Sequence, residues 1–245
     1  MILCADSQQV PLENHIAQLV YVDPPYNTDY NKCTTLSNIS YEDLMFHCIG
    51  SGFKLMSYES RMVICIGRPP TSYQLETLVV DILKRLPPDY SLEQELIWYF
   101  TFGKYTQRHF VPSHERILVI KRGNPSFNWQ AIAVESQRLR VGDPRGDPRG
   151  KTPDSVLSIA RVPGNSKERR FSEGDHRSIQ PEALCRLFVK AFTRPSDLIV
   201  DLFTGSGTMC VVANNNGRRY IGIDINETYC KEAANRVENG WKGKI

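Results

Sequence analysis

The segment from Leu198 to Asn226 constrains the fold more than any other part of the sequence. An apolar run leads into Gly205-Ser206-Gly207, a helical stretch follows, and a second apolar run ends at Asp224. This order predicts a strand, a tight glycine turn, a helix and a second strand, which is half of a nucleotide-binding unit. Strands joined by a helix lie parallel in a sheet that is covered on both faces. We therefore expect an α/β fold.

The glycine turn and the acid after it indicate an adenosine-type ligand. Glycines let the backbone approach a ligand closely, and Asp224 lies 23 residues after Asp201, near the spacing at which an acid binds ribose hydroxyls. The sequence has neither the third glycine of a dinucleotide fingerprint nor the lysine of a phosphate-binding loop. S-adenosylmethionine, which carries no phosphate and would place its sulfonium near Asp201, fits best. An ordinary strand-to-helix turn is the alternative.

The rest of the chain alternates in the same way. Apolar and amphipathic periods predict strands at 17–22, 61–66, 96–102, 116–121, 198–202 and 220–223, and helices at 40–57, 73–86, 181–192, 208–215 and 227–237. In such sheets, ligands bind beyond the carboxyl ends of the strands. Both chemically suggestive loops directly follow predicted strands, so they are expected at the same edge.

The second suggestive loop is DPPYN (Asp23–Asn27), which follows the predicted strand at 17–22. Its two prolines fix the backbone and remove two amide donors, so the loop is stiff and presents carbonyl groups. The Asp23 carboxylate and the Pro24 carbonyl are two acceptors for the two N–H groups of an exocyclic amine. Tyr26 offers a face for stacking a base taken out of its duplex, worth about 1–3 kcal/mol. On its own, the string is equally a plain turn after a strand.

DPPYN together with DLFTGSGT (Asp201–Thr208) resembles the amino-methyltransferases of DNA. The catalytic loop comes first and the cofactor loop last, which is similar to the β group of that family. The resemblance implies a Rossmann-like fold for S-adenosylmethionine-dependent methyl transfer, with helices on both faces of a mostly parallel sheet of seven strands, the last antiparallel. It implies a catalytic domain of residues 1–100 and 176–245, and an inserted target-recognition region of residues 101–175.

The resemblance also assigns the site residues. The catalytic residues would be Asp23, Pro24, Pro25 and Tyr26. The cofactor-binding residues would be Asp6, Asp23, His176, Pro181, Asp201, Phe203, Gly205, Ser206, Gly207, Thr208, Asp224 and Asn226. The chain departs from the family at Gln180, because Ile-Gln-Pro stands where Gln-Lys-Pro is usual. A missing lysine would weaken cofactor binding or alter a DNA contact.

The implied reaction is direct transfer of a methyl group from S-adenosylmethionine to N6 of a flipped adenine in double-stranded DNA. The amino group at N4 of cytosine has the same donors. Cytosine enzymes of the family more often have serine in place of Asp23, which favours adenine. An RNA or protein amide as substrate, or a non-catalytic DNA-binding relative, is a more distant alternative. The recognition sequence, a partner nuclease and the oligomeric state, a homodimer included, stay open.

Charge distribution bears on the partner. The net charge is only +3, but residues 138–177 hold ten Lys or Arg and six Asp or Glu among many prolines and glycines. This composition predicts an irregular basic segment that follows DNA phosphates, with a solvated surface loop as the alternative. Candidate DNA contacts in the insert are His109, His114, Arg116 and Trp129. His114 and Arg116 fit equally as strand-end residues or as partners of Glu115, and Trp129 as a core residue.

Composition also bears on the compartment. No apolar run approaches the roughly 18 residues of a membrane span, and the N-terminus lacks the pattern of a signal peptide. The seven cysteines form no CxxC pair, which argues against a disulfide framework and against a zinc site. We therefore expect a DNA-associated protein of the cytoplasm, without a metal and without a membrane partner.

Overall fold

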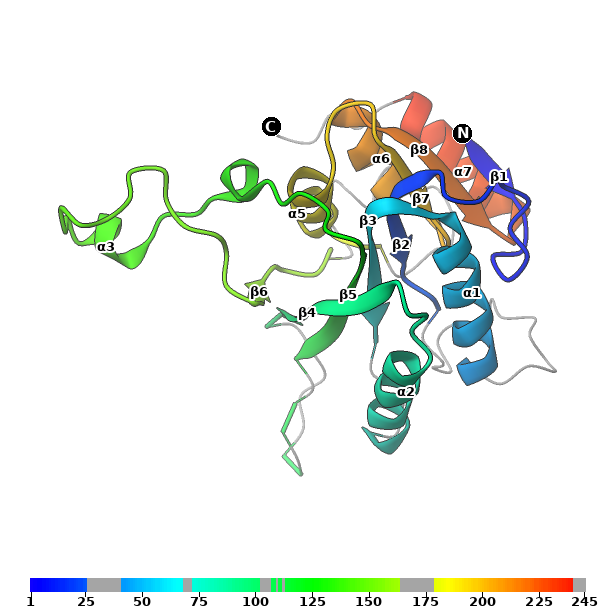
Figure 1. Ribbon diagram of the computed structural model, residues 1–245, viewed down its shortest axis with the longest axis horizontal. Helices are drawn as coiled ribbons and strands as arrows, with labels where there is room; N and C mark the ends of the chain where they lie inside the picture. The colour runs from blue at the N-terminus through cyan, green and yellow to red at the C-terminus, as the bar shows by residue number, and fades with distance from the viewer. Residues whose placement is uncertain are drawn as a thin grey trace.

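A computed structural model of the chain shows a sheet with helices on both faces (Figure 1). It describes residues 1–25, 41–67, 72–101, 107–108, 110–111, 113–163 and 179–239, and for residues 41 and 72–76 it describes the backbone only. Three of the predicted site residues lie outside the described residues, namely Tyr26, His109 and His176. In the described part of the chain, no helix combines the length and the apolar character needed to cross a membrane.

The described strands form one sheet of eight, in the order β1-β8-β7-β2-β3-β5-β4-β6. The first five of these are parallel to one another, whereas β5 runs against both of its neighbours. The mostly parallel α/β sheet predicted from the sequence is thereby confirmed. The bounds are β1 Ile2–Cys4, β2 Ala17–Val22, β3 Met56–Ile66, β4 Tyr90–Tyr99, β5 His114–Arg122, β6 Val156–Ser158, β7 Leu198–Asp201 and β8 Arg219–Asp224.

The sheet differs from the expectation in two details. It has eight described strands instead of seven, because β6 adds three residue pairs to the free edge of β4. The antiparallel strand is β5, in the middle of the chain, instead of the last strand, β8. β5 follows β4 directly in the order of strands and pairs with it antiparallel, whereas the helix between β7 and β8 returns the chain so that those two strands run parallel.

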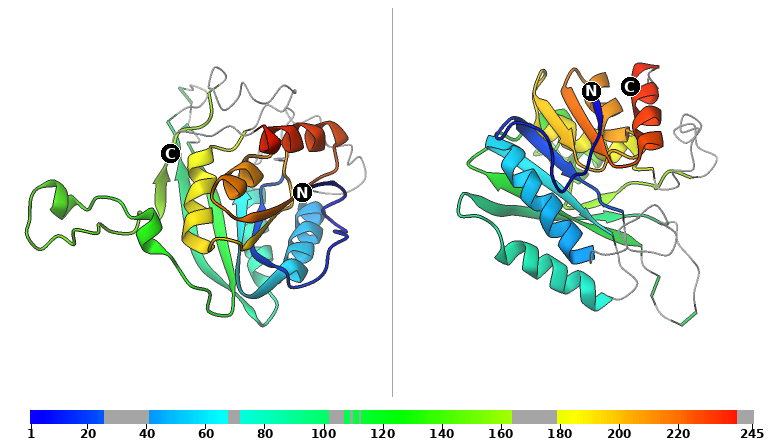
Figure 2. Two further views of the ribbon diagram at one scale, coloured as in Figure 1. Left: turned by 90° about the horizontal axis from the view of Figure 1, so that it is seen from above. Right: turned by 90° about the vertical axis from the view of Figure 1, so that its right-hand side faces the viewer.

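Two helical layers cover the sheet (Figure 2). Val20 and Val22 of β2 face the layer of α1 (Tyr41–Leu55) and α2 (Ser72–Lys84). Leu19 and Tyr21 face the opposite layer, made by α5 (Glu182–Phe192) and α6 (Thr208–Asn215), with α7 (Glu227–Glu238) beside α6. Because β2 is buried on both faces, its residues are apolar almost throughout, as in other parallel sheets.

The register of the parallel strands brings four carboxyl ends to one edge of the sheet. Tyr21 of β2 lies opposite Asp201 of β7, and Asp201 lies opposite Gly222 of β8. On the far side of β8, Cys4 of β1 lies opposite Asp224. The loop after β2 and the glycine turn after β7 are therefore neighbours, although they are far apart in the sequence.

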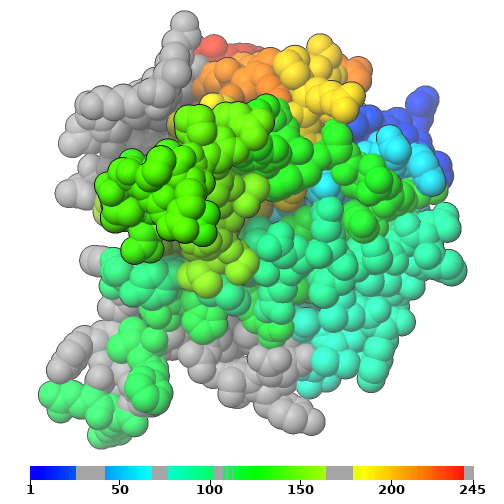
Figure 3. All heavy atoms as spheres, turned by 60° about the vertical axis from the view of Figure 1, so that its left-hand side comes forward, coloured from blue at the N-terminus to red at the C-terminus, as the bar shows by residue number. Residues whose placement is uncertain are grey.

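Part of the predicted insert belongs to the sheet. Strands β5 and β6 lie within residues 101–175, yet they pair with β3 and β4. Residues 123–155, which we call the arm, leave the body between β5 and β6 and project from it (Figure 1), and in Figure 3 they lie in front of the body. The arm contains a short 3-10 helix, η1 (Trp129–Ile132), and one helical turn, α3 (Gln137–Arg140). A bridge between Val134 and Lys151 and the Arg149 guanidinium, 5.4 Å from the centre of the Trp129 ring, join its two halves.

The root of the arm is fixed by Arg61 of β3, whose exposed fraction is 1%. Its guanidinium donates to the carbonyl oxygens of Ser126, at 2.8 Å, and Pro125, at 3.1 Å. It also forms a two-point ion pair with Glu93, with N–O distances of 2.5 and 2.9 Å, and lies 4.7 Å from the centre of the Phe192 ring. Planar two-point pairing of this kind fixes orientation as well as position. The root of the arm is thus tied to β3, β4 and α5.

Candidate active site at the carboxyl edge of the sheet

Three aspartates meet where the parallel strands end. Asp23 is the first residue after β2, Asp201 ends β7, and Asp224 ends β8. The charges of Asp23 and Asp224 both act on Asp201 and disfavour its ionisation. Buried negative charge in proteins is ordinarily balanced by a cation or by hydrogen bonds. This edge is therefore suited to a ligand that carries positive charge.

Asp201 is the most deeply buried of these three residues, with an exposed fraction of 3%. Burial raises its pKa from 3.8 to about 8, and the carboxylates of Asp23 and Asp224 contribute to the rise. The Phe203 N–H, which donates to Oδ1 at 3.2 Å, acts in the opposite direction. A carboxyl group so strongly perturbed at the end of a strand marks a candidate functional site, because a nearby cation would restore its charged form.

The glycine turn is held to the end of β8 by its backbone. The Thr204 N–H donates to the Ile223 carbonyl at 2.8 Å, and the Gly205 N–H donates to Asp224 Oδ2 at 2.9 Å. Gly207 has a φ of +78°, and a Cβ at this position would lie 2.9 Å from the Cβ of Ala233 on α7. Glycine is needed there both for the backbone conformation and for close packing. The turn is consequently rigid before any ligand binds.

Asp224, predicted to bind ribose, also fastens this turn to α7. Its Oδ1 accepts from the Asn226 N–H at 2.9 Å, while Oδ2 accepts from Gly205. Asn226 in turn caps α7, because its side chain accepts from the Thr228 and Tyr229 N–H groups. Each carboxylate oxygen has a second lone pair, so the structural role is compatible with a contact to ribose, which stays a prediction.

The segment after β1 lies beside the glycine turn. The Ala5 N–H donates to the Asp224 carbonyl at 2.9 Å, and the Ser7 hydroxyl donates to the Leu202 carbonyl. Asp6, between these two residues, is exposed, and its Oδ1 accepts from the Gln8 N–H at 2.9 Å. The carboxylate predicted to lie near the cofactor adenine is therefore placed on the rim of the same edge.

The loop after β2 is packed against the segment that precedes α5. Asp23 is half-buried and Pro24 is buried, with Pro25 half-buried beside it. Asp23 Oδ2 accepts a hydrogen bond from Gln180 Nε2 at 2.6 Å. Pro181, also buried, is the residue directly before α5. Asp23 and Pro181, both predicted site residues, thus lie in neighbouring segments, and Gln180 joins the two.

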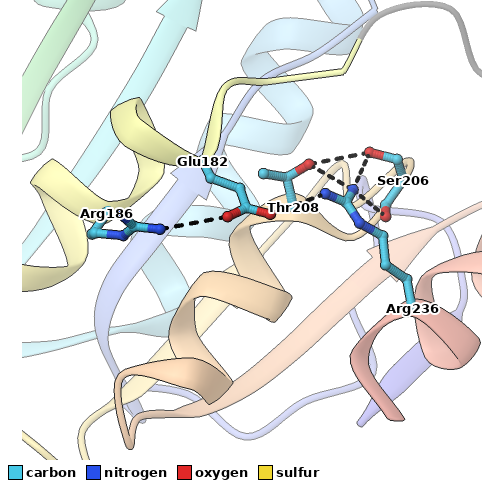
Figure 4. A network of polar contacts seen from close by, with 5 residues as sticks. All are labelled: Glu182, Arg186, Ser206, Thr208 and Arg236. Carbon is cyan, nitrogen blue, oxygen red and sulfur yellow. Dashed lines mark hydrogen bonds and ion pairs between the residues drawn. The ribbon is translucent and has the colours of Figure 1, made fainter. Parts of the chain in front are cut away.

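A buried arginine on α7 braces the glycine turn and was not among the predicted residues. Arg236, with an exposed fraction of 4%, donates through one nitrogen to the Ser206 carbonyl (3.0 Å), the Ser206 hydroxyl (3.1 Å) and the Thr208 hydroxyl (2.9 Å) (Figure 4). Another of its nitrogens lies 3.5 Å from Glu182 in the first turn of α5, which also pairs with Arg186. The network therefore links α7, α5 and the turn.

The sequence holds a signal for this brace. Arg236 shares the buried face of α7 with Cys230, Ala233 and Val237. A charged residue on the apolar face of a short amphipathic helix needs a buried partner. The sequence alone does not say which partner it finds.

Three of the residues predicted to contact DNA are described, namely His114, Arg116 and Trp129. All three are far from the glycine turn in the sequence. His114 begins β5 and is exposed. Arg116 pairs with Glu95 across the strands, with an N–O distance of 2.5 Å, and Glu115 pairs instead with Arg161. Trp129 is half-buried in the arm.

Comparison with known proteins identifies the family. The model of the DNA methylase family whose members act on N6 or N4 amino groups matches residues 17–235. The chain belongs to this family. The match includes the loop after β2, the glycine turn and most of α7. The family predicted by the two sequence motifs is confirmed.

Curated relatives match a part of their own length. The DNA adenine methyltransferase YhdJ of Escherichia coli (strain K12) is 31% identical over 157 residues, which is 60% of this chain and 52% of that protein. The chain spans about half the length of the curated relatives it matches.

Solved structures show the fold. The PvuII DNA methyltransferase, described as cytosine-N4-specific, superposes with a TM-score of 0.72 at 16% identity, over 96% of this chain and 85% of that one. The complex of M1.HpyAVI with S-adenosylmethionine superposes with a TM-score of 0.60 at 18% identity, over 96% and 98% of the two chains. This chain therefore has the Rossmann-like fold of S-adenosylmethionine-dependent DNA methyltransferases, as predicted.

Proposed function

We propose that this chain transfers a methyl group from S-adenosylmethionine to an exocyclic amino nitrogen of DNA, with N6 of a flipped adenine as the target. The observation that carries the proposal is the register of β2 against β7, which sets Asp23 beside Asp201 and the glycine turn. One strand end offers acceptors for an amine, and its neighbour offers a place for a cation. Membership of the DNA methylase family supports the same reaction.

The residues around Asp201 fit the cofactor. S-adenosylmethionine, when bound, supplies a methyl group activated by a sulfonium. Asp201, whose pKa of about 8 reflects its burial among other carboxylates, gains from a positive charge nearby. Without a Cβ, Gly205 lets an adenosine approach the backbone closely, and Asp224 and Asp6 are the residues that we propose to bind its ribose and its adenine.

Asp23 and Pro24 would hold the acceptor amine. The Asp23 carboxylate and the Pro24 carbonyl accept its two N–H groups, which aims the nitrogen lone pair at the methyl group. As a nitrogen–carbon bond replaces the methyl carbon–sulfur bond, positive charge would pass from sulfur to nitrogen. The Asp23 carboxylate would stabilise this charge and accept the proton that the methylated nitrogen loses. Most of the rate enhancement then comes from positioning two reactants in line, so no covalent bond to the protein is required. Pro25 stiffens the loop, and Tyr26 stacks the base.

Adenine is the favoured base, and N4 of cytosine is the second candidate. Asp23 at the first position of the motif favours adenine, and the Escherichia coli relative is named as an adenine enzyme. The superposition on an enzyme described as cytosine-N4-specific favours the second candidate. Both bases present an amine with two N–H groups, so the same residues serve either reaction.

Double-stranded DNA is the proposed partner, and the arm is the proposed part of the recognition region 101–175 that follows its phosphates. The arm holds five Lys or Arg and four Asp or Glu, and each of these acids pairs with a basic residue. Exposed ion pairs contribute only about 0–1 kcal/mol, so phosphates can replace the carboxylates at little cost. Residues 1–100 and 176–245 remain the proposed catalytic domain, with β5 completing its sheet.

The deciding experiment is transfer of labelled methyl from S-adenosylmethionine to unmethylated duplex DNA, followed by digestion and nucleoside analysis by mass spectrometry. N6-methyladenine is the expected product. N4-methylcytosine would keep the roles of Asp23 and Asp201 and change the base. DNA binding without any labelled nucleoside would reject the proposal in favour of a non-catalytic relative.

A further inference from the structure

Gln180 makes a contact that neither the family motifs nor its position in the chain assigns. It lies two residues before α5, is half-buried, and donates from Nε2 to Asp23 Oδ2 at 2.6 Å. Its other polar atom, Oε1, is buried and has no hydrogen-bond partner among the residues that the structure describes. One end of the amide is thus bound to the proposed catalytic carboxylate, and the other end is an unused acceptor.

The orientation of this amide follows from its partner. An ionised carboxylate only accepts hydrogen bonds, so the NH2 group of Gln180 must face Asp23 and Oε1 must face away from it. A buried acceptor without a donor is unfavourable, and such atoms in native proteins call for an explanation. A ligand that brings an N–H group into the site would satisfy it.

The surroundings of the amide are strongly charged. Asp201 and Asp224 lie on the neighbouring strand ends, and Glu182, with its partner Arg236, lies in the first turn of α5. The amide itself is neutral, so it restrains Asp23 without cancelling its negative charge. A carboxylate that must stabilise positive charge on an amine needs both a fixed orientation and an intact charge.

We propose that Gln180 is a positioning residue, whose N–H orients the Asp23 carboxylate and whose Oε1 accepts an N–H hydrogen bond from the bound ligand. The inference rests on the proposed function, because it gives Gln180 a role in the same methyl transfer. The N–H group comes from the ammonium of the cofactor, because Asp23 and Pro24 accept both N–H groups of the target amine.

Two substitutions take the two functions of the amide apart. Gln180→Met removes donor and acceptor at similar length, and Gln180→Glu keeps acceptors and loses the donor. For each variant we would measure the Kd for S-adenosylmethionine by calorimetry, the kcat, the KM for DNA and the thermal unfolding midpoint. We expect Gln180→Met to lower kcat about 100-fold, because a misplaced carboxylate loses most of the benefit of positioning.

The acceptor role of Oε1 is tested by cofactor affinity. Gln180→Met should raise the Kd for S-adenosylmethionine about tenfold and leave the KM for DNA unchanged. Gln180→Glu, which keeps acceptors, should bind the cofactor at least as well as Gln180→Met. A wild-type Kd in Gln180→Met would overturn the acceptor role.

The pH profile of Gln180→Glu separates orientation of Asp23 from a purely structural role. Two facing carboxyl groups share one proton at lower pH, and the shared O–H then donates to Asp23 as the amide does. We expect the ratio of variant to wild-type kcat to be highest at low pH and to fall as the pair loses its proton. Because Asp201 is present in both proteins, its effect on kcat cancels in the ratio of variant to wild-type kcat. A structural role for Gln180 predicts a flat ratio.

Gln18→Met is the matched control. Gln18 lies on β2 at the opposite edge of the sheet, where it accepts from the Leu198 N–H at 2.8 Å and donates to the Ser57 hydroxyl. Its substitution should lower the unfolding midpoint without changing the Kd, the kcat or the pH ratio. If Gln180→Met behaves in the same way, with kcat and both affinities of the wild type, the proposal is wrong.

Failure of the proposed function is a separate result. A wild-type chain that methylates no DNA would reject the function, and the role of Gln180 would then be judged on cofactor binding alone. In that case an unchanged Kd for S-adenosylmethionine in Gln180→Met overturns the inference.

Discussion

The site at the carboxyl edge and the arm are built from different kinds of contact. In the site, Asp23 and Gln180 are 157 residues apart in the sequence, and Arg236 and Ser206 are 30 apart. In the arm, Asp143 pairs with Arg145 and Asp147 with Arg149, two residues away in each case. The contacts of the site are largely buried, whereas those of the arm are exposed.

This difference separates two kinds of sensitivity. A contact between distant segments exists only when the whole sheet is folded, and its loss leaves buried polar groups behind. A contact between near neighbours in an exposed turn is replaced by water with little loss. Substitutions in the site should therefore affect chemistry and folding, and substitutions in the arm should affect DNA binding alone.

The largest expected effect comes from Asp23→Ala. Removal of the carboxylate should lower kcat by at least about 1,000-fold, because charge developing on the amine is no longer stabilised. The Kd for S-adenosylmethionine should change by less than a few-fold in calorimetry. Asp154→Ala in the arm is the control, with kcat expected at the wild-type value. Near-normal turnover of Asp23→Ala would exclude the proposed mechanism.

Arg236→Met should be the most destabilising single change in the site. Breaking a buried ion pair by removing one partner costs about 3–5 kcal/mol of unfolding free energy. Because Arg236 also holds Ser206 and Thr208, the Kd for the cofactor should rise as well. Urea denaturation and calorimetry measure the two effects. Arg145→Met, which removes an exposed member of an ion pair in the arm, should leave the unfolding free energy at the wild-type value.

The pH dependence of the unfolding free energy should also differ between the site and the arm. The pKa of Asp201 is raised from 3.8 to about 8, so the folded protein holds a proton that the unfolded chain has lost between these values. The unfolding free energy should therefore fall as pH rises from 3.8 toward 8, with a slope of at most about 1.4 kcal/mol per pH unit. Asp201→Asn should flatten this slope in urea titrations at several pH values.

Asp147 in the arm provides the comparison. Its hydrogen bonds with Arg149 lower its pKa from 3.8 to about 2, which is the opposite direction. Its contribution is therefore complete above 3.8 and is lost only as pH falls toward 2. Asp147→Asn should leave the slope between pH 4 and pH 8 unchanged. An equal change of slope in Asp201→Asn and Asp147→Asn would show that Asp201 is not the source of the pH dependence of the unfolding free energy.

Cofactor affinity should follow the ionisation of Asp201. A positively charged ligand binds the ionised carboxylate, so the affinity for S-adenosylmethionine should rise with pH until about 8 and then level off. Binding at pH 7 should release a proton, which calorimetry detects in buffers of different ionisation enthalpy. Proton uptake instead of release would contradict the position proposed for the cation.

The smallest expected effect is that of Arg149→Ala in the arm. It should raise the KM for DNA a few-fold and reduce the salt dependence of DNA binding by about one phosphate contact. The Kd for the cofactor and the unfolding midpoint should stay at their wild-type values. An unchanged salt slope, measured by titration of labelled duplex at several salt concentrations, would remove Arg149 from the proposed DNA surface.

Much of the sheet could be predicted because its signals are local. The apolar run Ala17–Val22 and the helix Thr208–Asn215 were predicted with the bounds that the structure shows. Strand β6 was missed, because it has three residues and two of them are exposed. Nothing in so short a segment distinguishes a strand from a loop until β4 offers an edge to pair with.

Sequence motifs predicted the two loops of the site. They did not predict the contacts between segments that are distant in the sequence. The loops around Asp23 and Gly205 carry recognisable residue patterns, whereas the contacts of Gln180 and Arg236 depend on which segments the fold brings together. Pairing of Arg116 with Glu115, one of the alternatives, does not occur. Neighbours in a strand point to opposite faces, so Arg116 meets Glu95 on β4 instead.

Because the root of the arm is fixed to the body, the part of the arm beyond the root could be replaced by an arm from another protein. Strand β5 ends at Arg122, β6 begins at Val156, and Arg61 binds the backbone at Pro125 and Ser126. β2, β7 and β8 lie on the other side of β3, so an arm of different length would not shift their register. A chimaera that grafts a foreign arm onto this root should acquire the salt-dependent DNA affinity of the donor and retain the chemistry of its own sheet edge.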